Sequence, residues 1–335
     1  MMIASEQTFL QPPEVVEAYQ RRGYWQKETL GESLRRWAEA YKDHVALTDH
    51  RGEMSFAALD RRADRLAGGL PELGITAGDR VLLQLPNGAN FVALSFALFR
   101  LGALLIFVLP AQRINDLDGL CRNAQPVAYI CKDRFLGFDY RAMGVELVAR
   151  HACLGNIIVD GEARQCCNLD GLDGDPPTGV APRPTEIACL LLSGGTTGTP
   201  KLIPRSHADY AYNARASAEL CGFSSDTVYL TALPAAHNFT LACPGILGTL
   251  SCGGRIVMAR TPGGDETFPL IARQKVTVTS LVAALVSLWL QQREWDDSDL
   301  SSLRLLQVGG ARLSPEVARQ IGPALALLWQ IDGTM

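Results

Sequence analysis

Residues 193–201 read Ser193-Gly194-Gly195-Thr196-Thr197-Gly198-Thr199-Pro200-Lys201. They follow an apolar run, Ile187 to Leu192, which predicts a buried strand. The glycines allow backbone conformations that a side chain would forbid, and N–H groups exposed in such a turn form an anion-binding concavity. The stretch also carries several hydroxyl groups and a lysine, and it contains no carboxylate. This set of donors favours a polyanionic ligand such as a nucleoside triphosphate.

Two common nucleotide-binding motifs do not fit this stretch. A Walker loop requires glycine directly before its lysine and serine or threonine after it, whereas Pro200 precedes Lys201 and Leu202 follows it. The G-x-G-x-x-G fingerprint of dinucleotide-binding folds does not match either. On spacing alone, a glycine- and threonine-rich surface loop without a ligand stays an alternative.

Beyond its spacing, the stretch resembles the phosphate loop of the adenylate-forming superfamily, which includes acyl-CoA synthetases, peptide-synthetase adenylation domains and luciferases. The longer string from Leu192 to Arg205 is similar to the aryl-acid branch, the salicylate– and 2,3-dihydroxybenzoate–AMP ligases of siderophore assembly. The resemblance runs from Gly23-Tyr24-Trp25 to about Gly333. It implies a catalytic role for Lys201, and ATP phosphate binding by Lys201 together with Ser193, Gly194, Gly195, Thr196, Thr197, Gly198 and Thr199.

A second motif, Ala235-Ala236-His237-Asn238-Phe239, follows a predicted strand, and ligands bind at the carboxyl edge of an open α/β sheet. A lone histidine is more often structural. The resemblance to the family's A-H-N-[YF] motif implies instead that His237 is catalytic, near the acyl carboxylate and the α-phosphate. By the same resemblance, Asn238 hydrogen-bonds the ortho-hydroxyl of an aryl acid and Phe239 forms a wall for its ring.

Cys243 bears on the choice of substrate. By resemblance, the matching residue tends to be serine in enzymes that activate 2,3-dihydroxybenzoate and cysteine in those that activate salicylate. A thiol is a bulkier and weaker hydrogen-bond partner than a hydroxyl. The sequence therefore favours salicylate, with 2,3-dihydroxybenzoate as the alternative, while a purely structural role of Cys243 in the core stays open.

The third motif is Gln307-Val308-Gly309-Gly310-Ala311-Arg312. A double glycine often makes a simple strand-to-helix turn, and it also lets flat rings approach the backbone closely. The resemblance implies that Gly309, Gly310 and Ala311 lie between the aryl pocket and the adenine. Arg205 and His207, which follow the first motif, either add positive potential there or face solvent.

Strands alternate with helices along the chain, which indicates an α/β fold with mostly parallel sheets flanked by helices. Gln165 to Pro184 lacks periodicity and predicts a surface connection between two lobes. We therefore expect lobes at about 50–185 and 186–335, with 1–49 packing on the second lobe. Helices are predicted at 13–24, 29–41, 55–70, 91–100, 206–221, 244–250, 269–274 and 283–292, and strands at 45–48, 81–85, 103–109, 127–131, 157–159, 187–192, 228–233, 255–259, 276–281 and 305–308.

Composition excludes several classes of function. The 335 residues carry a net charge of −4 without a basic run, so nucleic acid is not an expected partner. The nine cysteines form no C-x-x-C and several lie in apolar runs, which favours a reduced, cytoplasmic protein. The apolar stretch Phe91 to Leu109 is interrupted by Arg100 and Gly102, so we expect no membrane span. No residues have metal-ligand spacing, and Mg²⁺ is expected to arrive bound to ATP.

The last residues, Gln330-Ile331-Asp332-Gly333-Thr334-Met335, depart from the family's Q-x-F-G-M-A-E-G motif. Asp332 stands where the family has an aromatic residue, and the glutamate that helps to bind Mg²⁺ is absent. The resemblance then implies an incomplete large N-terminal domain over 1–335, without the small C-terminal domain and its adenylation lysine. We expect this chain alone to be inactive.

The resemblance implies ATP-dependent adenylation of an aryl acid, most simply salicylate, to aryl-AMP and pyrophosphate. The aryl group then passes to the phosphopantetheine thiol of an aryl carrier protein. One alternative is a non-catalytic remnant that binds nucleotide or aryl acid. Another is a general acyl-CoA ligase, whose pocket would lack the His-Asn-aromatic run.

Overall fold

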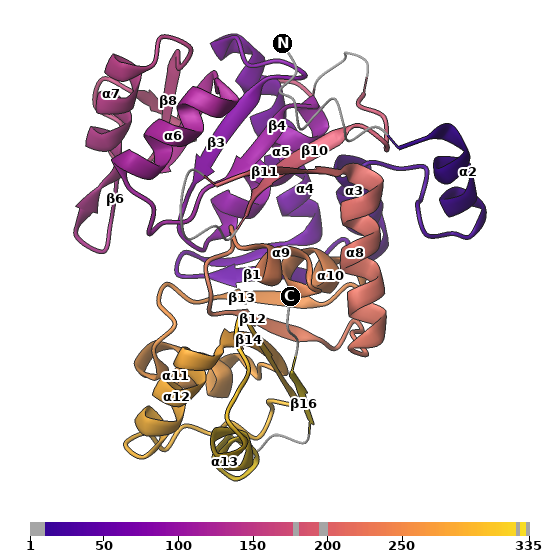
Figure 1. The fold of residues 1–335 in the computed structure, drawn as a ribbon, viewed down its shortest axis with the longest axis vertical. Coiled ribbons are helices and arrows are strands. Elements are labelled where there is room, and N and C mark those ends of the chain that lie inside the picture. Colours follow the sequence, from indigo (N-terminus) through magenta and orange to yellow (C-terminus); the bar gives the residue numbers. More distant parts are fainter. Residues whose placement is uncertain (1–10, 177–180, 194–199, 326–328, 333–335) are drawn as a thin grey trace. The chain divides into compact units, whose positions relative to one another are not determined.

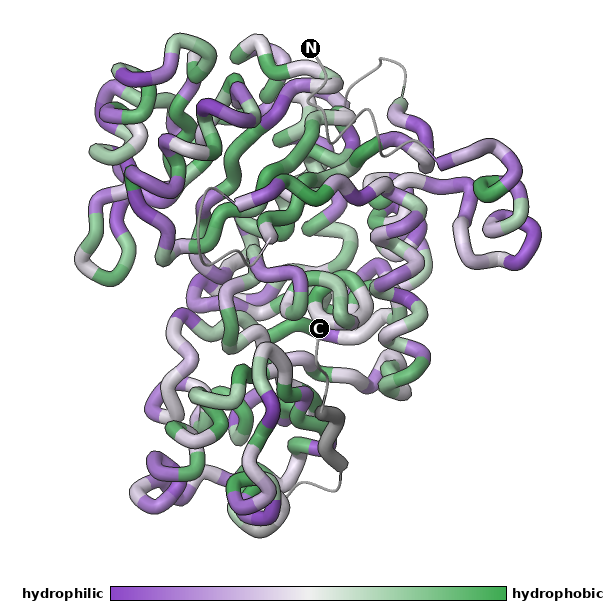
Figure 2. The backbone as a smooth tube through the Cα atoms, viewed as in Figure 1, coloured by the Kyte–Doolittle hydropathy of each residue, from purple (hydrophilic) through white to green (hydrophobic). Residues whose placement is uncertain are grey.

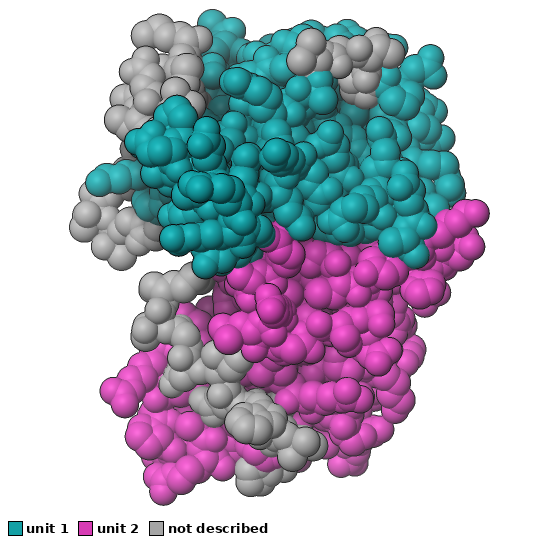
Figure 3. All heavy atoms as spheres, turned by 90° about the vertical axis from the view of Figure 1, so that its right-hand side faces the viewer, with its two compact units in different colours: residues 1–40, 57–86, 90–212 teal, residues 41–56, 87–89, 213–335 magenta. Residues whose placement is uncertain are grey.

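The computed structural model describes residues 11–176, 181–193, 200–325 and 329–332, drawn as ribbon in Figure 1. Contacts between residues divide the chain into two compact units, coloured separately in Figure 3. Unit 1 holds residues 1–40, 57–86 and 90–212, and unit 2 holds residues 41–56, 87–89 and 213–335. Each unit contains one seven-stranded sheet among the described residues.

The sheet of unit 1 has the order β11-β10-β4-β3-β5-β8-β9. All neighbouring strands pair in parallel except β10 and β11, which form an antiparallel hairpin at one edge. A separate small hairpin joins β6 and β7. The strands are β3 (Arg80–Gln84), β4 (Leu104–Phe107), β5 (Ala128–Lys132), β6 (Arg134–Phe135), β7 (Phe138–Asp139), β8 (Asn156–Asp160), β9 (Cys167–Asn168), β10 (Ile187–Leu192) and β11 (Leu202–Ser206).

Helices flank this sheet. Helix α3 begins with a reciprocal capping box, in which Glu32 accepts a hydrogen bond from the Thr29 N–H and Thr29 Oγ1 accepts one from the Glu32 N–H. Helix α7 packs on β5 and β8, with α6 beside it (Figure 1). The helices are α2 (Pro13–Arg21), α3 (Leu30–Tyr41), α4 (Phe56–Gly69), α5 (Ala89–Leu101), α6 (Ile114–Ala124), α7 (Tyr140–Arg150) and α8 (His207–Leu220), with 3-10 turns at Leu70–Leu73 and Leu169–Gly171.

A core of unit 1 forms between the sheet and helices α6 and α7. The residues of strands β4 and β10 are mostly hydrophobic (Figure 2). Parallel strands buried on both faces are typically continuous apolar runs. Fully buried side chains here include Leu82, Ile106, Leu117, Leu120, Tyr129, Leu147 and Leu190.

The sheet of unit 2 has the order β16-β15-β14-β12-β13-β1-β2, and it is parallel except for the antiparallel edge pair β1–β2. Its strands are β1 (Val45–Asp49), β2 (Gly52–Ser55), β12 (Val228–Thr231), β13 (Arg255–Met258), β14 (Val278–Val282), β15 (Leu305–Gly309) and β16 (Trp329–Asp332). Its helices are α9 (Asn238–Ala242), α10 (Gly245–Ser251), α11 (Gly264–Gln274), α12 (Ala283–Arg293) and α13 (Pro315–Leu325).

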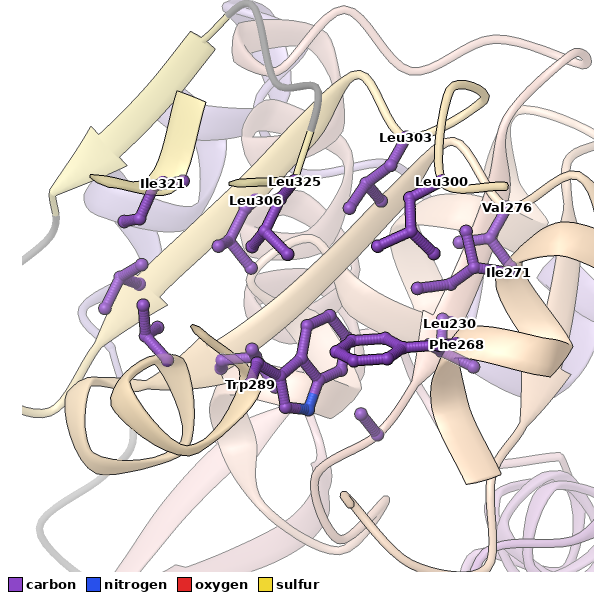
Figure 4. Close-up of a cluster of buried hydrophobic side chains, with 14 of the residues drawn as sticks. Leu230, Phe268, Ile271, Val276, Trp289, Leu300, Leu303, Leu306, Ile321 and Leu325 are labelled. Carbon is purple, nitrogen blue, oxygen red and sulfur yellow. The ribbon is translucent and has the colours of Figure 1, made fainter. Parts of the chain in front are cut away.

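The main core of unit 2 lies between its sheet and helices α11 to α13. Figure 4 shows the rings of Phe268 and Trp289 against each other, and their centroids are 5.1 Å apart in an edge-to-face arrangement. Such pairs add about 0.5–1.5 kcal/mol beyond the burial of their area. Leu230 from β12 and Leu306 from β15 close the cluster from the sheet side.

These sheets confirm the predicted α/β class and most predicted elements. The described helices contain none that is long and apolar enough to cross a membrane. Phe91–Leu109 forms α5 and β4 as expected, with Gly102 at φ +75° between them. Helix α11 begins at Gly264 rather than at Pro269, because the buried Phe268 and Ile271 outweigh the single hydrogen bond that Pro269 removes.

The boundary between the two units differs from the expected one. The sequence predicts a second lobe from residue 186, but β10 pairs with β4 and β11 pairs with β10, so both strands extend the sheet of unit 1. The described residues before Tyr41 also cluster with unit 1, and only 41–49 of the segment 1–49 belongs to unit 2. The expected surface connection contains β9, which pairs with β8, and the buried Leu169. The actual passage into unit 2 lies within helix α8, where no break in the sequence pattern marks it.

Candidate active site

The first predicted motif connects the two strands of the hairpin in unit 1, which we call the phosphate hairpin (residues 187–206). Leu192 and Leu202 are paired at the end of the ladder. Beyond them, the Ser193 N–H donates to the Lys201 carbonyl and the Lys201 N–H donates to Ser193 Oγ, both at 2.9 Å. Gly194, Gly195, Thr196, Thr197, Gly198 and Thr199 lie outside the described residues. The two ends of the loop are therefore held together by one main-chain bond and one bond to the Ser193 hydroxyl, and Lys201 is exposed.

The polar residues after the hairpin loop have structural partners. Arg205 forms an ion pair with Asp209 and lies over the ring of Tyr210, 5.0 Å from its centroid. His207 is fully buried, and its Nδ1 accepts a hydrogen bond from the Leu30 N–H at 3.3 Å. Burial lowers the pKa of His207 to about 4, so the imidazole is neutral at pH 7. His207 thus neither faces solvent nor adds positive potential.

His237 stands at the end of the loop that follows β12 in unit 2. It occupies the N-cap position of α9, where its Nδ1 accepts a hydrogen bond from the Phe239 N–H at 3.2 Å. A neutral imidazole that accepts at Nδ1 carries its proton on Nε2. Desolvation by the surrounding protein lowers the pKa of His237, although the residue is exposed at the surface. At pH 7 His237 therefore offers an exposed N–H donor at a helix N-terminus, a position suited to an anionic oxygen.

Two amides surround the thiol of Cys243, which ends α9. Asn238 Nδ2 lies 3.5 Å from Cys243 Sγ, and Asn213 Nδ2 lies 3.4 Å from it. Asn213 is fixed by a second hydrogen bond, to the Ala242 carbonyl at 2.6 Å. The predicted pair Asn238 and Cys243 is thus brought together by one turn of helix. Asn213, from α8, was not predicted, because nothing near it in the sequence forms a motif.

Phe239 packs against the third motif. A Cβ atom placed on Gly309 would lie 3.0 Å from Phe239 Cε1, so the ring rests directly on the backbone at the end of β15. Gly310 follows at φ +80°, a left-handed conformation that favours glycine, and Gly310 and Ala311 are exposed. The structure therefore brings the 237–243 segment and the glycine turn together at the carboxyl ends of the strands of unit 2.

A buried chain of polar side chains lies below this segment. The Tyr229 hydroxyl donates to Ser280 Oγ at 3.0 Å, and Ser280 Oγ donates to Gln307 Oε1 at 2.9 Å. Gln307 Nε2 then approaches the Cys243 carbonyl at 3.4 Å. Burial raises the pKa of the Tyr229 hydroxyl, which stays protonated. Polar residues within otherwise apolar strands, Ser280 in β14 and Gln307 in β15, were the sequence signal that could have revealed this network.

The described residues contain no group of three or more His, Cys, Asp or Glu side chains that could hold a metal ion. The nine cysteines, which all lie among the described residues, form no disulfide there. The hydrogen-bond donors described for the candidate site are thus imidazole, amide and hydroxyl groups in unit 2, and a lysine at the phosphate hairpin in unit 1.

Comparisons with known proteins cover nearly the whole chain. The family described as "AMP-binding enzyme" matches residues 34–330. The 2,3-dihydroxybenzoate-AMP ligase of Bacillus subtilis is 46% identical over 310 residues, which are 92% of this chain and 58% of that protein. The salicyl-AMP ligase / salicyl-S-ArCP synthetase of Mycobacterium tuberculosis is 46% identical over 322 residues, 94% of this chain and 57% of that protein.

Among solved structures, the apo structure of MbtA from Mycobacterium smegmatis has a TM-score of 0.88 and 42% identity, covering 96% of this chain and 60% of that one. The anthranilate CoA ligase AuaEII shares the fold. It has a TM-score of 0.82 and 21% identity, and the match covers 92% of this chain and 60% of that one. The chain thus spans slightly less than three fifths of the length of these curated relatives.

Proposed function

Because the chain belongs to the AMP-binding enzyme family, we propose that it serves the ATP-dependent adenylation of an aryl carboxylic acid. In this reaction a carboxylate oxygen forms a bond to the α-phosphorus of ATP. The bond from that phosphorus to the bridging oxygen of the β-phosphate breaks, and pyrophosphate leaves. The product is a mixed anhydride, aryl-AMP.

One observation carries the proposal: in the 237–243 segment an amide lies 3.5 Å from a thiol, and the neighbouring Phe239 ring packs on Gly309. The Asn238 amide can hydrogen-bond a hydroxyl next to the carboxylate. Phe239, resting on Gly309, presents a flat apolar surface to a ring. A site of this kind suits a planar acid with a polar edge better than a flexible alkyl chain, which has no use for the amide.

The polar residues of the two units would bind different parts of the substrates. His237 Nε2–H can donate to an anionic oxygen of the carboxylate or the α-phosphate. Lys201 and Ser193, at the phosphate hairpin, would hold the phosphates, together with Gly194, Gly195, Thr196, Thr197, Gly198 and Thr199. Such transfers depend largely on positioning and charge stabilisation. ATP enters as its Mg²⁺ complex, so the metal is brought with the substrate.

We propose salicylate as the preferred acid, with 2,3-dihydroxybenzoate second. Cys243 Sγ already lies between two amide donors, and a sulfur atom there leaves less room and a weaker partner for a 3-hydroxyl than an oxygen would. The two curated relatives described above act, by their names, on these same two acids. The downstream partner would be a carrier protein whose thiol attacks the aryl carbonyl and releases AMP. The reaction would belong to siderophore biosynthesis and take place in the cytoplasm.

Calorimetric titration of the 335-residue chain tests the site directly. We expect a non-hydrolysable analogue of salicyl-AMP to bind orders of magnitude more tightly than salicylate, because it spans both substrate positions. A benzoyl analogue should bind about tenfold more weakly, since it lacks the ortho-hydroxyl. Asn238→Ala should remove this difference, whereas Asn156→Ala, which also removes a side-chain amide but in unit 1, should not.

Turnover is measured on a protein of the relatives' length, since the chain aligns with 58% of the Bacillus subtilis ligase. We expect ATP–pyrophosphate exchange with salicylate in a fusion that adds the remaining part of such a relative. Binding of the analogue without exchange in that fusion would favour a non-catalytic binding protein. Equal affinity for a hexanoyl and a salicyl analogue would instead favour a general acyl-CoA ligase.

A further inference from the structure

Asn87 makes an unusually complete set of hydrogen bonds within unit 2. It lies between β3 and α5 in the sequence, outside the predicted helices and strands, yet residues 87–89 cluster with unit 2. Its Nδ2 lies 3.0 Å from the carbonyl oxygens of Thr231 and Leu233 and 2.9 Å from that of Ala259. Its Oδ1 accepts a hydrogen bond from the Ala235 N–H at 2.7 Å. The side chain is buried.

These contacts lie where two parallel strands end. Strand β12 ends at Thr231 and β13 at Met258, and the main chain between Ala232 and His237 leaves the ladder to reach α9. Leu233 and Ala235 are buried in this loop. Buried backbone groups must find partners. The Thr231 carbonyl also accepts from the Ala259 N–H at 3.2 Å, whereas Asn87 is the partner found for the Leu233 and Ala259 carbonyls and the Ala235 N–H beyond the strand ends.

The backbone that carries Asn87 is itself fixed within unit 2. The Ala89 N–H donates to Asp49 Oδ2 at 2.9 Å, and Asp49 Oδ1 accepts from the Arg51 N–H at 2.7 Å. Asp49 is the last residue of β1, which pairs with β13. The main chain just after Asn87 is therefore anchored to β1 through Ala89. The Asn87 side chain in turn anchors the loop after β12.

We infer that Asn87 is a positioning residue for the 237–243 segment. It fixes Ala235, two residues before His237, and so determines where the His237 imidazole and the Asn238 amide stand. A carboxamide fits this place because its NH₂ group donates to the carbonyls while its oxygen accepts from the Ala235 N–H. A carboxylate would face three carbonyl oxygens, and an alkyl group would take this partner from the Leu233 and Ala259 carbonyls and the Ala235 N–H. The catalytic part of this inference rests on the proposed function.

Hydrogen exchange in the 335-residue chain tests the local part. In Asn87→Ala we expect the amide of Ala235 and those of α9 to exchange at least about tenfold faster, since one hydrogen bond is worth roughly that factor. Amides in the middle of β12 and β13 should keep their protection. In the matched variant Asn156→Ala, which loses a 2.9 Å bond to the Leu73 carbonyl in unit 1, residues 235–242 should exchange as in the parent chain.

Ligand discrimination separates positioning from general support. We expect the parent chain to prefer the salicyl-AMP analogue over the benzoyl-AMP analogue about tenfold, and Asn87→Ala to lower that ratio to about one. A merely structural Asn87 would weaken both analogues equally and leave the ratio intact. If Asn87→Ala does not fold, Asn87→Ser keeps one donor and one acceptor and should give an intermediate ratio.

Two outcomes would overturn the inference. One is a loss of protection spread evenly over unit 2, and the other is an unchanged ratio with unchanged exchange at Ala235. Failure of the proposed function looks different: the parent chain would bind neither analogue, while Asn87→Ala would still accelerate exchange in residues 235–242.

Discussion

The loop of the phosphate hairpin in unit 1 and the 237–243 segment of unit 2 both come after a strand with a parallel neighbour, but they are held in different ways. The hairpin loop is closed at its base by two hydrogen bonds between Ser193 and Lys201, one within the main chain and one to Ser193 Oγ. The 237–243 segment is fixed by side chains that come from distant parts of the sequence: Asn87, Asn213 and Gln307. Changes in the first region should therefore alter ligand binding alone. Changes in the second should alter stability and specificity together.

The largest effect is expected at the glycine that follows the 237–243 segment. Gly245 has φ +48°, and an added Cβ would lie 1.8 Å from the Thr240 carbonyl oxygen. Gly245→Ala should destabilise unit 2 by about 4 kcal/mol or more, because the clash is with backbone that cannot move away. Denaturant unfolding measures this. Gly171→Ala, which meets nothing within 4 Å, is the control and should change stability by less than about 0.5 kcal/mol.

A change at the phosphate hairpin should do the opposite. Lys201→Ala should lower salicylate-dependent exchange in the extended fusion by about 10²–10³, the usual cost of losing one charge-stabilising group. The free energy of unfolding should stay within about 0.5 kcal/mol of the parent value, since Lys201 is exposed. Lys42→Ala, also exposed, serves as the control. Equal activity of the two variants would contradict a role for Lys201.

Acid should weaken unit 1 through a single buried group. The pKa of His207 is about 4 in the folded chain and 6.5 when unperturbed. Because the folded value is lower, protonation favours unfolding: the contribution of neutral His207 is complete above pH 6.5 and is lost as the pH falls toward 4. Between pH 6.5 and 5 we expect a loss of about 2 kcal/mol. Urea unfolding at several pH values should show this slope, and His207→Phe should flatten it.

The buried network under the 237–243 segment should give a smaller effect. Tyr229→Phe removes the hydroxyl that donates to Ser280 and should cost about 1 kcal/mol, the typical net value of one hydrogen bond. Thermal unfolding measures it. If the network orients Gln307, the double variant with Ser280→Ala should cost less than the sum of the two single changes. Strict additivity would show that the hydroxyls act independently.

The smallest effect concerns the choice between two acids. Cys243→Ser should shift the ratio of kcat/KM toward 2,3-dihydroxybenzoate by roughly fourfold, because a hydroxyl is a better partner for the 3-hydroxyl than a thiol. Stability should change by less than about 1 kcal/mol, since both side chains can accept from Asn213 and Asn238. An unchanged ratio would assign the preference to other residues.

The same contrast explains how far the sequence could be interpreted. The strand before Ser193 and the turn at Gly309 are local patterns, and each was predictable from neighbouring residues. The short helix α9 after His237 was not among the predicted helices. Helix α13 carried a local signal that was overlooked: Ser314 accepts from the Val317 N–H, and Pro315 occupies the first helical position. The serine and proline before an apolar repeat could have revealed it.

Other features had no local pattern to reveal them. The assignment of β10 and β11 to the first sheet depends on pairing with β4, some 80 residues earlier in the sequence (189 against 105). Asn87 looks like an ordinary turn residue until the ends of β12 and β13 are placed around it. Long-range pairing and buried side-chain hydrogen bonds are set by tertiary packing, which propensity and periodicity do not encode.

The interleaved chain of the two units has a consequence for synthesis on the ribosome. Strand β1 pairs with β13, and Leu47 lies opposite Ile256, so 209 residues separate the partners (256 − 47). At a translation rate of about 5–20 residues per second, the β1–β2 hairpin waits roughly 10–40 s before its parallel neighbour emerges. During that interval its unpaired edge is open to other chains. The polar residues at that hairpin, Asp49, His50, Arg51 and Glu53, would then protect the nascent protein from association before unit 2 can form.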